Sequence, residues 1–309
     1  MSASHGTRAV IAALLANLGI AVTKFLAWLL TGSSSMLAES IHSVADSGNQ
    51  ALLLLGGRRA RRRATRLHPF GYGRERYIYA FIVSIVLFSV GGLFALYEAW
   101  HKFQDPHGIE SWHWVPVIVL LVAIVMETFS FRTAIVESNK VRGRSSWAQF
   151  VRRSRSPELP VVLLEDLGAL LGLVFALFGV SMTLITHNGM WDAIGTTMIG
   201  VLLVTIAVVL AVETKSLLLG EAATEADEEA IAAALTADGL VDRIIHMRTL
   251  HLGPDELLVA AKIAINPSVT AAQLADEIDA AEARIRDAVP IARVIYLEPD
   301  IYAADAAAG

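Results

Sequence analysis

The sequence predicts a polytopic α-helical membrane protein with six transmembrane helices and a small α+β domain at its C-terminal end. Hydrophobic residues make up 55% of the 309 residues and charged residues only 18%, and the mean hydropathy is +0.54. These values are too apolar for a soluble domain. The apolar residues also fall in long runs separated by charged loops, which is the pattern of helices that cross a bilayer.

Six apolar runs are long enough to cross the hydrocarbon core of a membrane. We expect spans at about 9–30, 36–55, 77–100, 114–136, 159–185 and 193–212. The first run lacks the small-residue cleavage pattern of a signal peptide, so we interpret it as a retained helix. Together the six spans give a transmembrane domain at residues 1–216.

Basic residues are concentrated in the loops on one side of these spans. The loops at 58–76 and 140–155 are rich in arginine, whereas the loops on the other side contain only Lys102. The positive-inside rule therefore predicts that both termini and the arginine-rich loops are cytoplasmic. Four tryptophans fall at the opposite boundary, as in an aromatic belt; they are Trp100, Trp112, Trp114 and Trp191. Because spans flank the arginine run, we interpret it as a topology determinant that touches anionic headgroups, not as a nucleic-acid patch.

Residues 217–309 are predicted to form a soluble cytoplasmic domain. The net charge of the chain is −5, and the acidic residues are concentrated in this segment. Thr224 begins a helix as its N-cap, and apolar residues at helical spacing predict a second helix over 274–289. Segments 241–252, 257–265 and 293–297 are predicted strands. The order α-β-β-α-β indicates a sheet with both helices on one face.

The chain contains no cysteine. Disulfides, thiolate metal sites and thiol catalysis are therefore excluded. Any metal ion must be held by His, Asp, Glu, carbonyl oxygens or water.

The second span carries three ionisable residues within an otherwise apolar run. Glu39, His42 and Asp46 are spaced by three and four residues, so their side chains project from one face of the helix. Ionisable groups within a span are costly and persist where they face a bundle interior or an ion. A His and a carboxylate at i, i+4 suit a borderline cation such as Zn²⁺. Alternatively, His42 and Asp46 only bond to each other within a helix interface.

The fifth span carries a second acidic site, formed by Glu165 and Asp166. His42, Asp46 and Asp166 would supply three ligands to one ion, whereas Zn²⁺ favours four. The candidates for the fourth ligand are Glu39, Glu165, Glu127 of the fourth span and water. Neighbouring residues on a helix lie about 100° apart, so Glu165 and Asp166 do not both point squarely at one ion.

Other polar residues in the spans have structural interpretations. Glu127 either joins the site or pairs with Lys24 or Arg132. Lys24 is expected to snorkel or to pair with an acid in the bundle, because a cation is no ligand for another cation. Asp192 at the start of the sixth span is expected to be its N-cap.

Several motifs resemble the cation diffusion facilitator family. They are the six spans, the stretch 32–46 (GSSSMLAESIHSVAD) and the loop 68–75 (HPFGYGRE). The segments 163–166 (LLED) and 218–223 (LLGEAA) are similar to its zinc transporter nine branch. The resemblance covers nearly the whole chain. It implies a homodimeric metal/proton antiporter with a ferredoxin-like cytoplasmic domain, and it maps the transport site onto His42, Asp46 and Asp166.

The sequence departs from the family pattern at three places. Val162 stands where many family zinc exporters carry a His, four residues before Asp166. In the loop, Thr65 and Tyr72 accompany His68 at positions where family members can hold a second metal. The metal positions of the cytoplasmic domain correspond to Lys262, Tyr296 and Glu298, with His246 and His251 as weak candidates nearby.

The resemblance and the intramembrane acids together predict a divalent cation transporter, not an enzyme. The expected activity is Zn²⁺ efflux from the cytoplasm by proton antiport, with Mn²⁺, Fe²⁺ or Co²⁺ as alternative cargo. The expected partners are the cation, protons, the lipid bilayer and a second copy of the chain, with no resident cofactor and no nucleic acid. A membrane-embedded metallohydrolase is less favoured because no His-Glu-x-x-His motif is present, and a non-transporting scaffold is the other alternative. A bacterial inner membrane is the simplest expected location.

Overall fold

A computed structural model describes residues 3–106, 114–237 and 241–302 of the chain. It divides into two compact units. One consists of Met1–Arg59 with Arg76–Lys215, and the other of Ala60–Glu75 with Ser216–Gly309. The predicted belt residue Trp112 lies outside the described residues.

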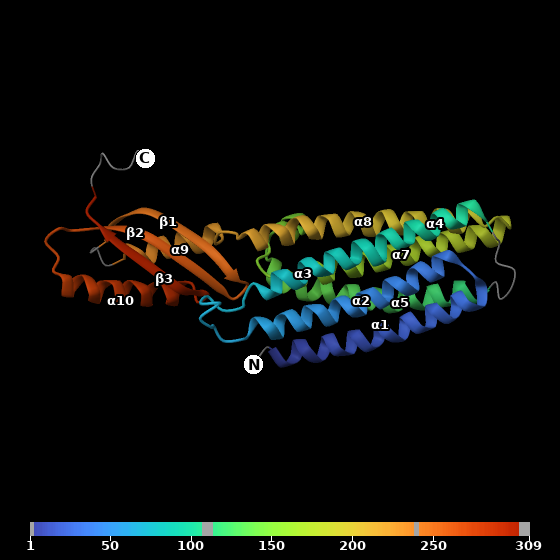
Figure 1. Ribbon diagram of the computed structural model, residues 1–309, viewed down its shortest axis with the longest axis horizontal. Helices are drawn as coiled ribbons and strands as arrows, with labels where there is room; N and C mark the ends of the chain where they lie inside the picture. The colour runs from blue at the N-terminus through green and yellow to red at the C-terminus, as the bar shows by residue number, and fades with distance from the viewer. Residues whose placement is uncertain (1–2, 107–113, 238–240, 303–309) are drawn as a thin grey trace. The chain divides into compact units, whose positions relative to one another are not determined.

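The first unit is a bundle of long helices that run side by side (Figure 1). Its helices are α1 (Ala3–Thr31), α2 (Ser34–Ala60), α3 (Glu75–Val86), α4 (Phe94–Gln104), α5 (Trp114–Arg142), α6 (Trp147–Arg153), α7 (Glu158–Thr186) and α8 (Met190–Leu219). A π-helical segment, η1 (Leu87–Leu93), joins α3 to α4. The short helix α6, between α5 and α7, was not predicted.

Four of the described helical segments are long and apolar enough to cross a membrane. They are Glu75–Gln104, Trp114–Arg142, Glu158–Thr186 and Met190–Leu219, and each contains one of the last four predicted spans. The chain is therefore a multi-pass membrane protein. The predicted spans at 9–30 and 36–55 lie in α1 and α2, which are not among these four segments. The apolar part found in α1, Asn17–Thr31, is shorter, and α2 carries the ionisable residues named above.

The core of the bundle draws buried apolar side chains from every long helix of the unit. Large apolar side chains such as Phe129 and Ile185 are instead exposed on its outer surface, 65% and 72% of their area. An outer surface of this kind suits the hydrocarbon of a bilayer, which is as apolar as the side chains themselves.

Glycines permit close approach between particular helices of the bundle. A Cβ on Gly92 of η1 would lie 2.6 Å from Val204 of α8, and one on Gly195 of α8 would lie 3.1 Å from the Cα of Gly179 in α7. Side chains at these positions would force the helices apart. Small residues at such contacts are the usual means by which membrane helices pack.

Asp192 caps a different helix from the one that was predicted. α8 begins two residues earlier, at Met190. The Asp192 Oδ1 atom accepts hydrogen bonds from the Ser35 backbone N–H at 3.3 Å, the Ser35 hydroxyl at 2.5 Å and the Ser33 hydroxyl at 3.1 Å. Asp192 therefore satisfies the start of α2, and the expectation that it caps its own helix is wrong.

The second unit contains a three-stranded sheet and two helices. Its elements are α9 (Glu225–Leu235), β1 (Val241–Gly253), β2 (Glu256–Ile265), α10 (Ala271–Ala288) and β3 (Ala292–Asp300). The strand order is β1-β2-β3, with β1 antiparallel and β3 parallel to β2. α9 packs on β1, α10 packs on β3, and the two helices contact each other. The predicted α-β-β-α-β order is confirmed, as is the Thr224 cap, whose hydroxyl accepts a hydrogen bond from the Asp227 backbone.

Candidate metal centre

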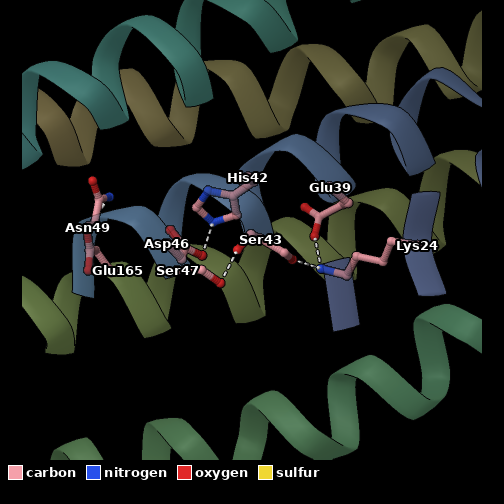
Figure 2. Close-up of polar contacts among 8 residues, drawn as sticks. All are labelled: Lys24, Glu39, His42, Ser43, Asp46, Ser47, Asn49 and Glu165. Carbon is pink, nitrogen blue, oxygen red and sulfur yellow. Dashed lines mark hydrogen bonds and ion pairs between the residues drawn. The ribbon is translucent and has the colours of Figure 1, made fainter. Parts of the chain in front are cut away.

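The three ionisable side chains of α2 are all buried inside the bundle. Glu39 and His42 are 0% exposed and Asp46 is 7% exposed. The His42 Nε2 and Asp46 Oδ2 atoms lie 3.4 Å apart, and a dashed line marks this contact in Figure 2. Both ring nitrogens of His42 and the Oδ1 atom of Asp46 have no hydrogen-bond partner among the described residues. Simple pairing of His42 with Asp46 therefore leaves buried polar atoms unsatisfied, which is costly unless a ligand completes them.

Lys24 of α1 is buried beside this cluster, at 2% exposure. Its Nζ atom lies 2.9 Å from Glu39 Oε2 and 2.9 Å from the Ser43 hydroxyl (Figure 2). Of the two expectations for Lys24, snorkelling or pairing with an acid, the second is observed, and the acid is Glu39. Because one oxygen of Glu39 is bound to an ammonium group, Glu39 is a weaker candidate for a metal ligand than Asp46.

The two acids of α7 have different partners. The Asn49 side chain of α2 donates a hydrogen bond to Glu165 Oε1 at 2.7 Å, and the Ser130 hydroxyl of α5 donates one to Asp166 Oδ2 at 3.0 Å. Glu165 and Asp166 are 4% and 5% exposed. Their divergent partners agree with the expected angle between neighbouring residues on a helix.

The candidate ligands share one buried region but are not gathered around a single point. Asp46 interacts electrostatically with Glu127, Glu165 and Asp166. No three His, Asp or Glu side chains within the described ranges lie close enough together to hold one metal ion. The structure thus brings His42 and Asp46 together and leaves Asp166 outside coordination distance.

Glu127 of α5 is buried, at 7% exposure. It makes no hydrogen bond or ion pair within the described part of the chain, so its pairing with Lys24 or Arg132 is not observed. Lys24 bonds to Glu39 instead. Glu127 does interact electrostatically with Asp166, so it lies in the same region as the other acids.

Sequence reasoning missed the polar residues that hold the carboxylates. Asn49 follows Asp46 by three residues and Ser130 follows Glu127 by three, so each shares a helix face with a candidate ligand. This spacing of three residues was the signal in the sequence that could have identified Asn49 and Ser130. A further neighbour is Gly91 of η1, since a Cβ there would lie 3.9 Å from His42 Nδ1. Segments of π-helix occur frequently at functional sites.

In the second unit, a lysine lies between two acids at the positions where the family resemblance puts a metal. Lys262 Nζ is 2.8 Å from Asp300 Oδ2 and 3.3 Å from Glu298 Oε1. Its bonds to Asp300 and then Glu298 raise the pKa of Lys262 above its ordinary value. The small cavity beside it, of about 170 Å³, is also lined by His246 and Arg248. Two permanent cations next to His246 disfavour a further cation there.

The loop around His68 is occupied by contacts within itself. The rings of His68 and Tyr72 lie 4.7 Å apart, and the Tyr72 hydroxyl lies 3.4 Å from the Thr65 hydroxyl. His251, the other weak candidate, is buried in β1 with its Nδ1 atom 3.3 Å from the Gly253 carbonyl.

Comparison with known proteins supports the resemblance. Residues 10–219 match the model of the cation efflux transmembrane domain. The mitochondrial proton-coupled zinc antiporter SLC30A9 of Xenopus laevis is 32% identical over 243 residues, which cover 78% of this chain and 43% of that protein. Metal tolerance protein C4 of Arabidopsis thaliana is 29% identical over 268 residues, 85% of this chain and 58% of that protein.

A bacterial relative matches over a shorter length. The zinc transporter ZitB of Pectobacterium atrosepticum is 28% identical over 120 residues, 39% of this chain and 36% of that protein. The chain spans about half the length of the two relatives named first. The family model, in contrast, covers most of the present sequence, including every candidate ligand in the spans. The chain therefore belongs to the cation efflux family, the cation diffusion facilitators, whose members are membrane cation transporters and not enzymes.

Proposed function

We propose that this protein exports a divalent metal cation across the membrane in exchange for protons, with Zn²⁺ as the preferred cargo. The observation that carries the proposal is the buried His42–Asp46 pair, whose unpartnered atoms face the bundle interior and not lipid. Membership of the cation efflux family supports it. So do its relatives, which include a proton-coupled zinc antiporter and a zinc transporter.

The spacing of the pair suits a tetrahedral cation. Two ligands that are each about 2.0–2.2 Å from a tetrahedral Zn²⁺ ion lie roughly 3.3–3.6 Å apart. The His42 Nε2 and Asp46 Oδ2 atoms are 3.4 Å apart. We therefore propose these two atoms as a preformed half of the transport site on α2.

The other half of the proposed site comes from α7. Asp166 supplies the third ligand, and Glu165, Glu127 or water supplies the fourth in place of the His that Val162 replaces. We leave Glu39 outside the set because Lys24 occupies one of its oxygens. Asp166 has to leave Ser130 and approach α2 for the site to close, so binding is coupled to a displacement between α2 and α7.

Competition between metal and protons would drive the exchange. Metal binding requires a neutral His42 and ionised Asp46 and Asp166. Protons that reach these residues from the outer side therefore expel the ion, and cytoplasmic metal displaces those protons in the next cycle. Alternating access between the two sides is a rocking of helices around a fixed site near the midplane.

The proposal includes the topology and assembly that the sequence predicts. It comprises six spans in a transmembrane domain at 1–216, a ferredoxin-like cytoplasmic domain at 217–309, cytoplasmic termini and a homodimer. The helical lengths of α1 and α2 support the count of six, and the arginine distribution supports the orientation. We propose a bacterial inner membrane as the location, which fractionation of the source cells tests. If a chain ending at 216 forms an unchanged dimer, the C-terminal domain is not the dimerisation domain.

Transport by reconstituted protein tests the function. Proteoliposomes with an internal zinc dye and an internal pH dye should show zinc uptake coupled to proton release from the lumen. Asp46→Ala should abolish uptake, whereas Glu137→Gln, which removes only an exposed partner of Lys140, should not. Wild-type zinc uptake by Asp46→Ala would refute the site, and zinc flux without proton movement would refute the antiport. Competition by Mn²⁺, Fe²⁺ and Co²⁺ in the same vesicles ranks the cargo.

A further inference from the structure

An apolar groove in the helical unit runs beside α7, and none of the acids of the candidate metal centre lines it. It has a volume of about 510 Å³ and is formed by α5, α6, α7 and α8. Nine of its ten lining residues are apolar or aromatic, and the tenth is Arg152 of α6. A cavity of about 300–1,000 Å³ with one or two polar groups is typical of sites that bind a small amphipathic molecule.

The groove is a built feature because α6 is held in place. Ser146 and Gln149 form a capping box at the start of α6. Phe150 of α6 is buried in a cluster with Ala134 of α5 and Leu163 of α7. Trp147, which lines the groove, is stacked under the Arg142 guanidinium at 4.2 Å. The wall that α6 contributes is therefore fixed by contacts on both of its neighbours.

The groove extends from the end of the spans into the depth of the hydrocarbon. Arg152 lies in the connection between α5, which ends at Arg142, and α7, which begins at Glu158. The deepest lining residue of α5, Phe131, is eleven residues before the end of that helix, which corresponds to roughly 16 Å. The predicted span of this helix ends at 136, so Phe131 lies about five residues, or roughly 8 Å, inside a hydrocarbon core that is about 30 Å thick.

Arg152 is the basic residue whose charge the groove leaves for an external partner. Its side chain is exposed and makes no hydrogen bond or ion pair with any other described residue. The neighbouring Arg142 is instead bound to Asn139 and to the Ser145 carbonyl. An apolar groove roughly perpendicular to the membrane plane, with an unpaired guanidinium at its mouth, complements an acyl chain attached to a phosphate.

We propose that this groove binds one anionic phospholipid per protomer, with an acyl chain against α5, α7 and α8 and the headgroup phosphate on Arg152. A small soluble anion does not fit, because nothing else in the lining is charged. A basic side chain near the membrane surface contributes about 1 kcal/mol to anionic lipid binding, which corresponds to about a fivefold change in affinity. None of the proposed metal ligands lines the groove, so lipid binding can be tested separately from the proposed transport.

Native mass spectrometry of the full chain in detergent tests the proposal. The protein is titrated with dioleoylphosphatidylglycerol and, in parallel, with dioleoylphosphatidylcholine, which has the same acyl chains without net charge. We expect one phosphatidylglycerol retained in preference to phosphatidylcholine. Arg152→Gln should weaken phosphatidylglycerol about fivefold. Ala148→Trp, which fills the groove from an exposed lining position, should displace it.

The matched control is Arg144→Gln, which removes an exposed arginine of the same loop that does not line the groove. Retention by this variant should equal that of the unaltered protein. The proposal is overturned if Arg152→Gln binds phosphatidylglycerol as the unaltered protein does. It is also overturned if Arg144→Gln weakens binding equally, since the attraction would then be diffuse, or if both lipids are retained alike.

Discussion

Lys24 places a positive charge inside the bundle, because its ammonium group is buried among apolar helices. Glu39 compensates that charge and in turn is compensated by it. Removing one member of a buried ion pair leaves the other as an uncompensated charge, which is far more costly than removing both. The pair also occupies one oxygen of a carboxylate that lies one helical turn from His42.

Charge removal at this pair should be strongly non-additive. We expect Lys24→Met and Glu39→Gln each to lower the free energy of unfolding by about 3–5 kcal/mol. The double variant should recover more than half of that loss, because no buried charge is left alone. Thermal unfolding of the four purified proteins in one detergent measures this. If the loss in the double variant equals the sum of the two single losses, the assigned pairing is contradicted.

The Lys262–Asp300 contact predicts a pH dependence in the sheet of the second unit. Lys262 and the Ile301 backbone N–H lower the pKa of Asp300, so the stabilisation by its carboxylate is present above the unfolded value of about 3.9 and is lost as the pH falls through the lower folded value. The raised pKa of Lys262 gives stabilisation that is complete below about 10.4 and is lost above its folded pKa.

Hydrogen exchange along β3 in the full chain, measured across pH, tests this dependence after correction for intrinsic exchange. Protection should be constant between about pH 5 and 10 and should weaken on acidification. In Lys262→Gln, the loss of protection at alkaline pH should disappear, and the loss of protection on acidification should begin at a higher pH. If protection in this variant is lost at the same acidic pH as in the unaltered protein, a group other than the Lys262–Asp300 pair causes the acid dependence.

Among the elements, the long helices follow directly from apolar runs, whereas η1 and α6 do not. A run of 20 apolar residues specifies a span because its backbone polar groups must bond internally in lipid. The π-helical segment Leu87–Leu93 instead contains the close contact of Gly92 with Val204, and such a contact is a property of two helices. α6 has only seven residues, too few for a periodic signal, although its capping box was present in the sequence.

The close approach at η1 gives a test at the level of helix packing. Gly92→Ala should destabilise the bundle by about 1–3 kcal/mol, because a Cβ would lie 2.6 Å from the Val204 side chain and 3.1 Å from its backbone nitrogen. Gly19→Ala in α1 is the control, since a Cβ there meets no atom within 4 Å. It should be neutral or stabilising by up to about 1 kcal/mol. Equal melting temperatures for both variants would mean that η1 and α8 separate without cost.

At the scale of the whole molecule, the sequence predicted which ionisable residues lie inside the bundle better than how they meet. Acids in an apolar run had to lie inside the bundle, and His42, Asp46, Glu165 and Asp166 are all buried there. The partners of Glu165 and Asp166 could not be predicted, because they depend on how α7 is rotated against α2 and α5. That these residues bind one ion together stays a prediction.

A cation that bridges α2 and α7 should stabilise the folded protein. Binding at a free zinc concentration one hundred times the dissociation constant adds about 2.7 kcal/mol. We expect zinc to raise the melting temperature, EDTA to reverse the increase, and His42→Ala or Asp166→Ala to lose it. Glu137→Gln should keep the full effect. A zinc-dependent increase that survives both ligand substitutions would place the bound ion elsewhere.

The bond network of Asp192 has a mechanical consequence for α2. It pins the first turn of α2 to the start of α8, so any swing of α2 relative to α8 has its pivot near Ser35. In a rigid lever the displacement grows with distance from the pivot, at 1.5 Å of length per residue. Ala60, the last residue of α2, is twenty-five residues from Ser35, whereas His42 is seven, so the far end should travel roughly three to four times as far as the imidazole. A small adjustment at the proposed metal site should therefore become a larger displacement at the arginine-rich end of α2.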